Sequence, residues 1–172
     1  MRRLVTFTCC LLLVLGYARA TRVSAGSFFA GLPVDGIPCQ AQEQVFEHIH
    51  SNLQLFDRGH QVVLPSQIGI PPGAGCLYWL HTHATDGFIH VESPVKRTFK
   101  LGEFFDIWQQ PLSWSRAASL RAPRGRRLSI WVNGHPWHGA NPRDIVLRDH
   151  ETIVIQNGPP FAAPKPVDWN MV

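Results

Sequence analysis

Three histidines and one glutamate lie at alternating positions around an Asp-Gly pair: His81, His83, His90 and Glu92. Asp-Gly between alternating apolar residues is a strong hairpin signal, and side chains along a strand alternate between its two faces. A two-residue loop at Asp86-Gly87 would pair His83 with His90. A four-residue loop over residues 84–87 would pair His81 with His90 instead. In either register the four side chains share one face of the hairpin.

This combination of side chains predicts a metal site, with a hydrogen-bonded polar cluster as the alternative. Neutral imidazole is a good ligand for Zn, Cu, Ni and Fe, and we take Zn or Cu as the best candidates. His81, His83 and His90 can supply three nitrogens, which is the number of protein ligands in an open catalytic zinc site. Glu92 would then be a fourth ligand or a catalytic group that moves a proton. Asp86 is expected to stabilise the turn.

A second His-x-His pair, His48 and His50, lies on one face of a strand predicted over residues 45–56. If this strand pairs beside the hairpin, five histidines converge. One ion cannot take all five, so the alternatives are two ions, or one ion with supporting histidines around its ligands. Cys39 and Cys76 lie nine and five residues before the two His-x-His pairs. A bond between them would tether the two segments.

The first 20 residues have the features of an export signal. Arg2 and Arg3 precede an apolar run, Leu4–Gly16, and the segment 18–20 is a small-x-small cleavage site. We expect a periplasmic or secreted product without a stable membrane span, because the apolar run is short for a bilayer. An uncleaved anchor is the alternative.

Removal of the signal changes the charge and the cysteine count. Three of the 16 basic residues and none of the 12 acidic ones lie in residues 1–20. The mature chain is therefore nearly neutral, and its charge does not indicate a nucleic-acid partner. Only Cys39 and Cys76 remain, and in an oxidising compartment such a pair predicts a disulfide. Two thiolate ligands to the same metal are the alternative.

The remaining chain is expected to fold as one domain of the α+β class, rich in strands. The predicted divisions are an irregular lead-in at 21–38, a single β-rich domain at 39–158 and a Pro-rich tail at 159–172. Antiparallel hairpins and one short helix, residues 102–109, are expected. From residue 76 onward the order of hairpin, helix and strands resembles a β-grasp (ubiquitin-like) layout. A small open β-barrel is the alternative.

Several other residues are assigned to the core, to the surface or to solvated loops. Residues 113–127 carry five arginines and are predicted to form a solvated loop, with contact to anionic lipid or glycan as the alternative. The large aromatic side chains are assigned to the core, with Trp137 as the exposed exception: Trp79, Phe104, Phe105, Trp108 and Trp131. Four histidines in turn-like contexts are assigned to the surface: His60, His135, His138 and His150.

An E-H-I-H segment, an L-H-T-H hairpin and an F-F-D-I-W helix occur together between Cys39 and Trp108. This combination resembles a group of small exported microbial proteins of unknown function, and the resemblance implies no activity. The leading hypothesis is therefore an exported protein that binds a transition-metal ion. The alternatives are a hydrolase or lyase that uses a metal-bound water, and a binding or adhesion module of the cell envelope without a metal.

Overall fold

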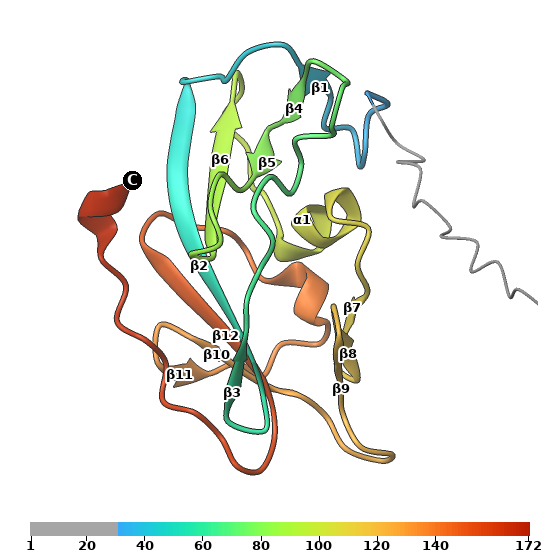
Figure 1. Cartoon of the computed structure of the whole chain (residues 1–172), viewed down its shortest axis with the longest axis vertical. Coiled ribbons are helices and arrows are strands. Elements are labelled where there is room, and N and C mark those ends of the chain that lie inside the picture. The colour runs from blue at the N-terminus through green and yellow to red at the C-terminus, as the bar shows by residue number, and fades with distance from the viewer. Residues whose placement is uncertain (1–30) are drawn as a thin grey trace, which may run out of the picture.

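The structure is a computed structural model that describes residues 31–172 (Figure 1). The predicted signal, residues 1–20, and the lead-in up to residue 30 lie outside the described residues. One seven-stranded sheet dominates, with the order β11-β10-β12-β2-β6-β5 and with β3 paired to β2. Its strands are β2 (Glu47–Asp57), β3 (His60–Val62), β5 (Leu80–His81), β6 (Phe88–Ser93), β10 (Ser129–Val132), β11 (His135–Pro136) and β12 (Glu151–Asn157).

The strand directions give this sheet an order that resembles the β-grasp layout. β2 and β12 run parallel at its centre, β6 is antiparallel to β2, and β10 is antiparallel to β12. The helix α1 (Leu101–Ile107) connects β6 to the later strands and lies against one face of the sheet (Figure 1). The described strands form open sheets and do not close into a barrel. The first strand of the seven-stranded sheet is β2, which the predicted layout from residue 76 onward omitted.

Side-chain alternation along β2 separates an apolar face from a polar face. Leu53 and Leu55 point toward α1 and are buried with Phe104 and Phe105 of that helix. Burial of large apolar side chains of this kind contributes about 1.5–3 kcal/mol each. The helix begins after Lys100, whose backbone N–H donates to Glu103 Oε2 over 2.7 Å. The predicted single helix is therefore confirmed.

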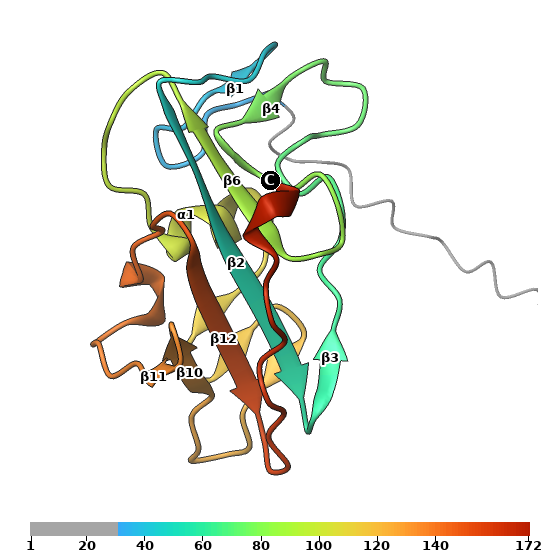
Figure 2. The same ribbon diagram turned by 90° about the vertical axis from the view of Figure 1, so that its left-hand side faces the viewer.

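The opposite face of the sheet carries polar side chains and is crossed by the C-terminal segment, residues 159–172 (Figure 2). Gln54 Nε2 donates to the carbonyl of Lys165 over 2.9 Å, and Gln54 Oε1 accepts from the Lys165 N–H over 2.8 Å. Gln156 forms the same pair of bonds with Ala162. The segment thus provides partners for two buried amides that would otherwise be costly to bury.

Two smaller sheets complete the described fold. β1 (Cys39–Gln40) pairs with β4 (Leu77–Tyr78). Beside these strands Cys39 and Cys76 form a disulfide with a Cα–Cα distance of 5.4 Å. The disulfide prediction is thereby confirmed, and the alternative of two thiolate ligands is wrong. Within residues 31–172 no helix is both long and apolar enough to cross a membrane.

The predicted solvated loop at 113–127 instead contains the second small sheet. Its strands are β7 (Leu112–Ser113), β8 (Arg116–Ala117) and β9 (Leu120–Arg121). Ala117 and Leu120 are buried, which explains why this polar segment is ordered against the core. Two aromatic assignments are also wrong: Trp131 is 36% exposed, whereas Trp137 is partly buried against the core.

A cluster of charged groups near the end of α1 makes stability depend on pH. Asp106 forms an ion pair with Arg143, and Asp35 lies beside it. A hydrogen bond with Asp106, burial and nearby negative charge raise the pKa of Asp35 from 3.8 to about 6, although Arg143 opposes the rise. The folded protein therefore binds this proton more tightly than the unfolded chain. Its stabilising contribution is complete below pH 3.8 and is lost as pH rises through about 6.

Asp35→Asn is expected to stabilise the protein increasingly as pH rises from about 4 through the folded-state pKa of Asp35, about 6. Asparagine resembles the protonated acid and tolerates the φ of 50° at this position. We expect no change in the free energy of unfolding near pH 4. At pH 7 we expect a gain of up to about 1 kcal/mol, since solvent screens these exposed carboxyls. Urea unfolding of both proteins at several pH values measures the difference, and an equal difference at all pH values would contradict the prediction.

Candidate metal centre

Strand β6 brings the two His-x-His pairs together, because it lies between β2 and β5. In the β2–β6 register His50 is opposite His90 and His48 is opposite Glu92. In the β5–β6 register His81 is also opposite His90. Residues opposite one another on neighbouring strands share a face. Four of the five predicted histidines, all except His83, and Glu92 therefore gather on the polar face of the sheet, away from α1.

The hairpin adopts the register of the four-residue loop, so the two-residue alternative is wrong. Two contacts fix the loop against β2: Asn52 Nδ2 donates to the carbonyl of Asp86 over 3.1 Å, and the Leu53 N–H donates to Gly87 over 2.9 Å. Asp86 Oδ1 also accepts from the Phe88 N–H over 3.1 Å. Asp86 therefore stabilises the turn, as predicted.

His83 reaches the cluster from the loop rather than from a strand. The chain leaves β5 at Thr82, whose hydroxyl donates to the Pro65 carbonyl over 3.1 Å and accepts from the Ile68 N–H over 3.0 Å. These bonds hold the segment 65–69 against the hairpin. Gly69 packs so closely that an added Cβ would lie 2.4 Å from the Leu80 carbonyl oxygen. His83 nevertheless ends with its Nε2 atom 3.1 Å from Nε2 of His81.

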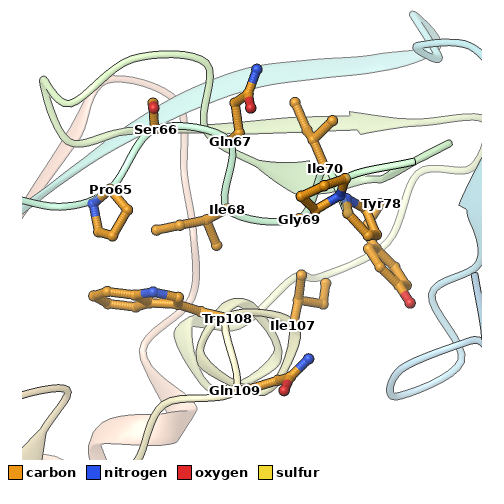
Figure 3. Close-up of a pocket in the computed structure, with 12 residues that line it drawn as sticks. Pro65, Ser66, Gln67, Ile68, Gly69, Ile70, Tyr78, Ile107, Trp108 and Gln109 are labelled. Atoms are coloured by element: carbon orange, nitrogen blue, oxygen red, sulfur yellow. The ribbon is translucent and has the colours of Figure 1, made fainter. Parts of the chain in front are cut away.

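A groove with a cavity of about 250 Å³ lies on the other side of this segment. Figure 3 shows Ile68 above Trp108, with Tyr78 and Gln109 at the side of the groove. None of the clustered histidines lines it. The segment 65–69 therefore supports the histidine cluster with one side and forms an apolar groove with the other.

Burial divides the cluster into a base and a rim. The base consists of His81, His50 and Glu92, which are at most 9% exposed. The rim consists of His48 and His83, whose side chains are 46% and 44% exposed. An ion held by the base would therefore remain accessible to solvent between the two rim histidines.

The buried ring of His81 directs the unprotonated nitrogen Nε2 into the cluster, toward His83. Its Nδ1 lies 2.9 Å from the backbone carbonyl of Tyr78. Since a carbonyl only accepts hydrogen bonds, Nδ1 carries the proton and Nε2 does not. Burial lowers the pKa of His81 from 6.5 to about 4, so the ring is neutral at neutral pH. A carbonyl that orients a neutral imidazole is the usual support for a metal-binding histidine.

Glu92 lies at the centre of the imidazoles. Its Oε1 is 3.4 Å from His48 Nε2 and 3.5 Å from His90 Nδ1, and its Oε2 is 3.8 Å from His81 Nε2. Burial raises the pKa of Glu92, but contact with His90 and the charges of His81 and His48 outweigh burial, so the pKa is lowered. Glu92 Oε2 and His90 Nδ1 are buried without a hydrogen-bond partner. Unpartnered buried polar atoms are costly, and bound metal would satisfy them.

The donor atoms are close enough to hold a metal ion. Two overlapping groups each have their potential ligand atoms within 4.8 Å of one another: His81, His83, His90 and Glu92, and His48, His50, His90 and Glu92. Two nitrogens bound to one tetrahedral zinc, at about 2.0–2.1 Å each, lie roughly 3.3 Å apart. The 3.1 Å between His81 Nε2 and His83 Nε2 is close to that value.

Two acidic residues near the cluster were missed by sequence reasoning. Glu43 Oε1 lies 3.5 Å from His83 Nε2. Asp149 Oδ1 accepts a hydrogen bond from the backbone N–H of His50 over 3.1 Å. Glu43 lies only five residues before His48, and nothing in its spacing distinguishes it. Asp149 reaches the site through the parallel pairing of β12 with β2, a contact that local sequence patterns do not reveal.

The four histidines assigned to the surface are all exposed: His60, His135, His138 and His150.

No family model matches the chain, and neither a curated protein nor a solved structure matches it. The function is therefore argued from the chemistry of the site itself.

Proposed function

We propose that this protein is exported and binds a transition-metal ion, Zn(II) or Cu(II), through His81, His83, His90 and Glu92. The arrangement of His81 carries the proposal. Its Nδ1 donates to the Tyr78 carbonyl, and its unprotonated Nε2 faces the Nε2 of His83 at 3.1 Å. The disulfide Cys39–Cys76 supports an oxidising compartment, in which such bonds persist.

Binding of the metal alone tests the proposal. Untagged protein dialysed against Zn(II) or Cu(II) is expected to retain at least one equivalent by elemental analysis. His83→Ala is expected to weaken binding at least about 10-fold through loss of one nitrogen ligand. Because this side chain is 44% exposed, the fold is expected to survive its removal.

A matched control comes from two histidines far along the chain from the cluster. His135→Ala/His138→Ala removes two exposed imidazoles and is expected to leave metal affinity unchanged. Wild-type protein that retains no metal after dialysis, or a control variant that loses as much affinity as His83→Ala, would overturn the proposal.

The open rim favours an exchangeable or catalytic ion over a closed structural one. Structural zinc sites are closed by four protein ligands, whereas catalytic sites leave a position for water or substrate. His48 and His83 are both about half exposed, so solvent reaches this side of the cluster. In a hydrolase or lyase, the ion would lower the pKa of a bound water. Glu92 would then accept or donate the proton.

A further inference from the structure

We propose that the site holds two ions bridged by the carboxylate of Glu92, a proposal that rests on the metal binding proposed above. The first ion lies beside His81 and His83, and the second lies beside His48 and His50. Carboxylate-bridged pairs of this kind place their ions about 3.5–4 Å apart.

The two oxygens of Glu92 face different halves of the cluster. Oε1 lies 3.4 Å from His48 Nε2, whereas Oε2 lies 3.8 Å from His81 Nε2. A carboxylate oriented in this way can give one oxygen to each ion. The same side chain would serve as a ligand in both of the overlapping groups.

The number of donors exceeds what one ion of the preferred geometry accepts. Zinc in proteins is usually tetrahedral and takes four ligands. The cluster offers five imidazoles and one carboxylate. If only the His81 side were occupied, His48 and His50 would be left at ligand distance from Glu92 and His90 with no ion of their own. Each half is by itself a compact set of donors.

Two unpartnered atoms support an ion on each side. Glu92 Oε2 faces the His81 half, and His90 Nδ1 lies 3.5 Å from Glu92 Oε1 on the His48 half. Both atoms are buried without a hydrogen bond. In the two-ion site the first ion takes Oε2 together with His81 and His83, and Nδ1 of His90 is left to the second ion. This second ion, beside His48, would satisfy that nitrogen.

An acidic residue also lies near each of the two halves of the cluster. One carboxylate cannot neutralise two divalent ions, so further negative charge is needed nearby. Glu43 lies 3.5 Å from His83 at one end of the cluster. Asp149 accepts a hydrogen bond from the backbone N–H of His50 at the other end. Each proposed ion therefore has an acidic residue on its own side.

Stoichiometry and magnetic coupling with Cu(II) test the two-ion site. Full-length untagged protein is expected to bind two equivalents of Cu(II) by elemental analysis. His48→Gln/His50→Gln and His83→Ala are each expected to bind one. Two Cu(II) ions that share a carboxylate couple magnetically. The integrated electron paramagnetic resonance signal of wild-type protein should therefore rise with the first equivalent and fall as the second binds.

The outcomes separate this inference from the proposed function. One equivalent in wild-type protein and still one in His48→Gln/His50→Gln would overturn the second ion while leaving metal binding intact. Two equivalents with two full, uncoupled spins would overturn the bridge. No bound metal in wild-type protein would overturn the proposed function itself. The coupling measurement uses unmodified protein, so it remains decisive if the double variant fails to fold.

Discussion

Glu92→Gln is expected to weaken metal binding by roughly 100-fold or more. Loss of a partner that only supports a ligand already reduces metal affinity about 10–100-fold, and Glu92 contacts His48, His81 and His90 directly. At a free metal concentration of about 1,000 times the wild-type Kd, binding stabilises the wild-type fold by about 4 kcal/mol. A variant with 100-fold weaker binding would gain only about 1.4 kcal/mol under the same conditions.

The metal-free protein is expected to respond much less. Glu92 is buried, and its Oε2 atom has no hydrogen-bond partner. Contact with His90 and the charges of His81 and His48 nevertheless lower its pKa, so the fold favours the charged form. Glutamine keeps the shape, removes the cost of burying the charge and loses these contacts. We therefore expect the metal-free variant to unfold within about 1 kcal/mol of wild-type protein.

Thermal unfolding with and without added metal measures both effects, and Glu47→Gln provides the control. Glu47 lies on the same strand, one residue before His48, and its side chain points to the opposite face. This variant should keep the full stabilisation by metal. A Glu92→Gln protein that metal stabilises as strongly as it stabilises wild-type protein would show that the carboxylate is not part of the site.

Much of the site was predictable because it depends on side-chain alternation. His48 and His50, and separately His90 and Glu92, share a face through the period of two along a strand. The pairing of β2 with β6 could be stated only as a condition, since no local pattern fixes which strands are neighbours. Asp149 was not predictable at all, because its position depends on a parallel pairing across about a hundred residues.

Long-range packing explains why local sequence patterns did not predict the structure of some segments. The run 145–147 has the composition of a strand, yet it makes only one isolated bridge, between Val146 and Lys100. Its backbone hydrogen bonds go to Phe99 and to Leu101, the first residue of α1. The polar segment that forms β7, β8 and β9 lacks a hydrophobic period and is ordered by a few buried side chains. Neither outcome follows from residue type alone.

Loss of the disulfide through Cys39→Ala/Cys76→Ala is expected to reduce the free energy of unfolding by about 4 kcal/mol. The two cysteines are 37 residues apart, so the bond restricts a long loop in the unfolded chain. At about 2–4 °C per kcal/mol for a chain of this size, the melting temperature should fall by roughly 8–16 °C. Reductant should lower the melting temperature of wild-type protein by the same amount and leave the variant unchanged.

The same substitution separates the stability of the fold from the integrity of the site. The disulfide lies beside the β1–β4 ladder, in which Cys39 is opposite Tyr78, and the Tyr78 carbonyl orients His81. The pairing of β6 with β2 and β5 holds the other ligands without the disulfide. We therefore expect metal affinity to fall less than about 10-fold, below the loss expected from removing a ligand. A larger loss of affinity, or a loss of stability below about 1 kcal/mol, would show that the disulfide acts mainly on the site rather than on the unfolded chain.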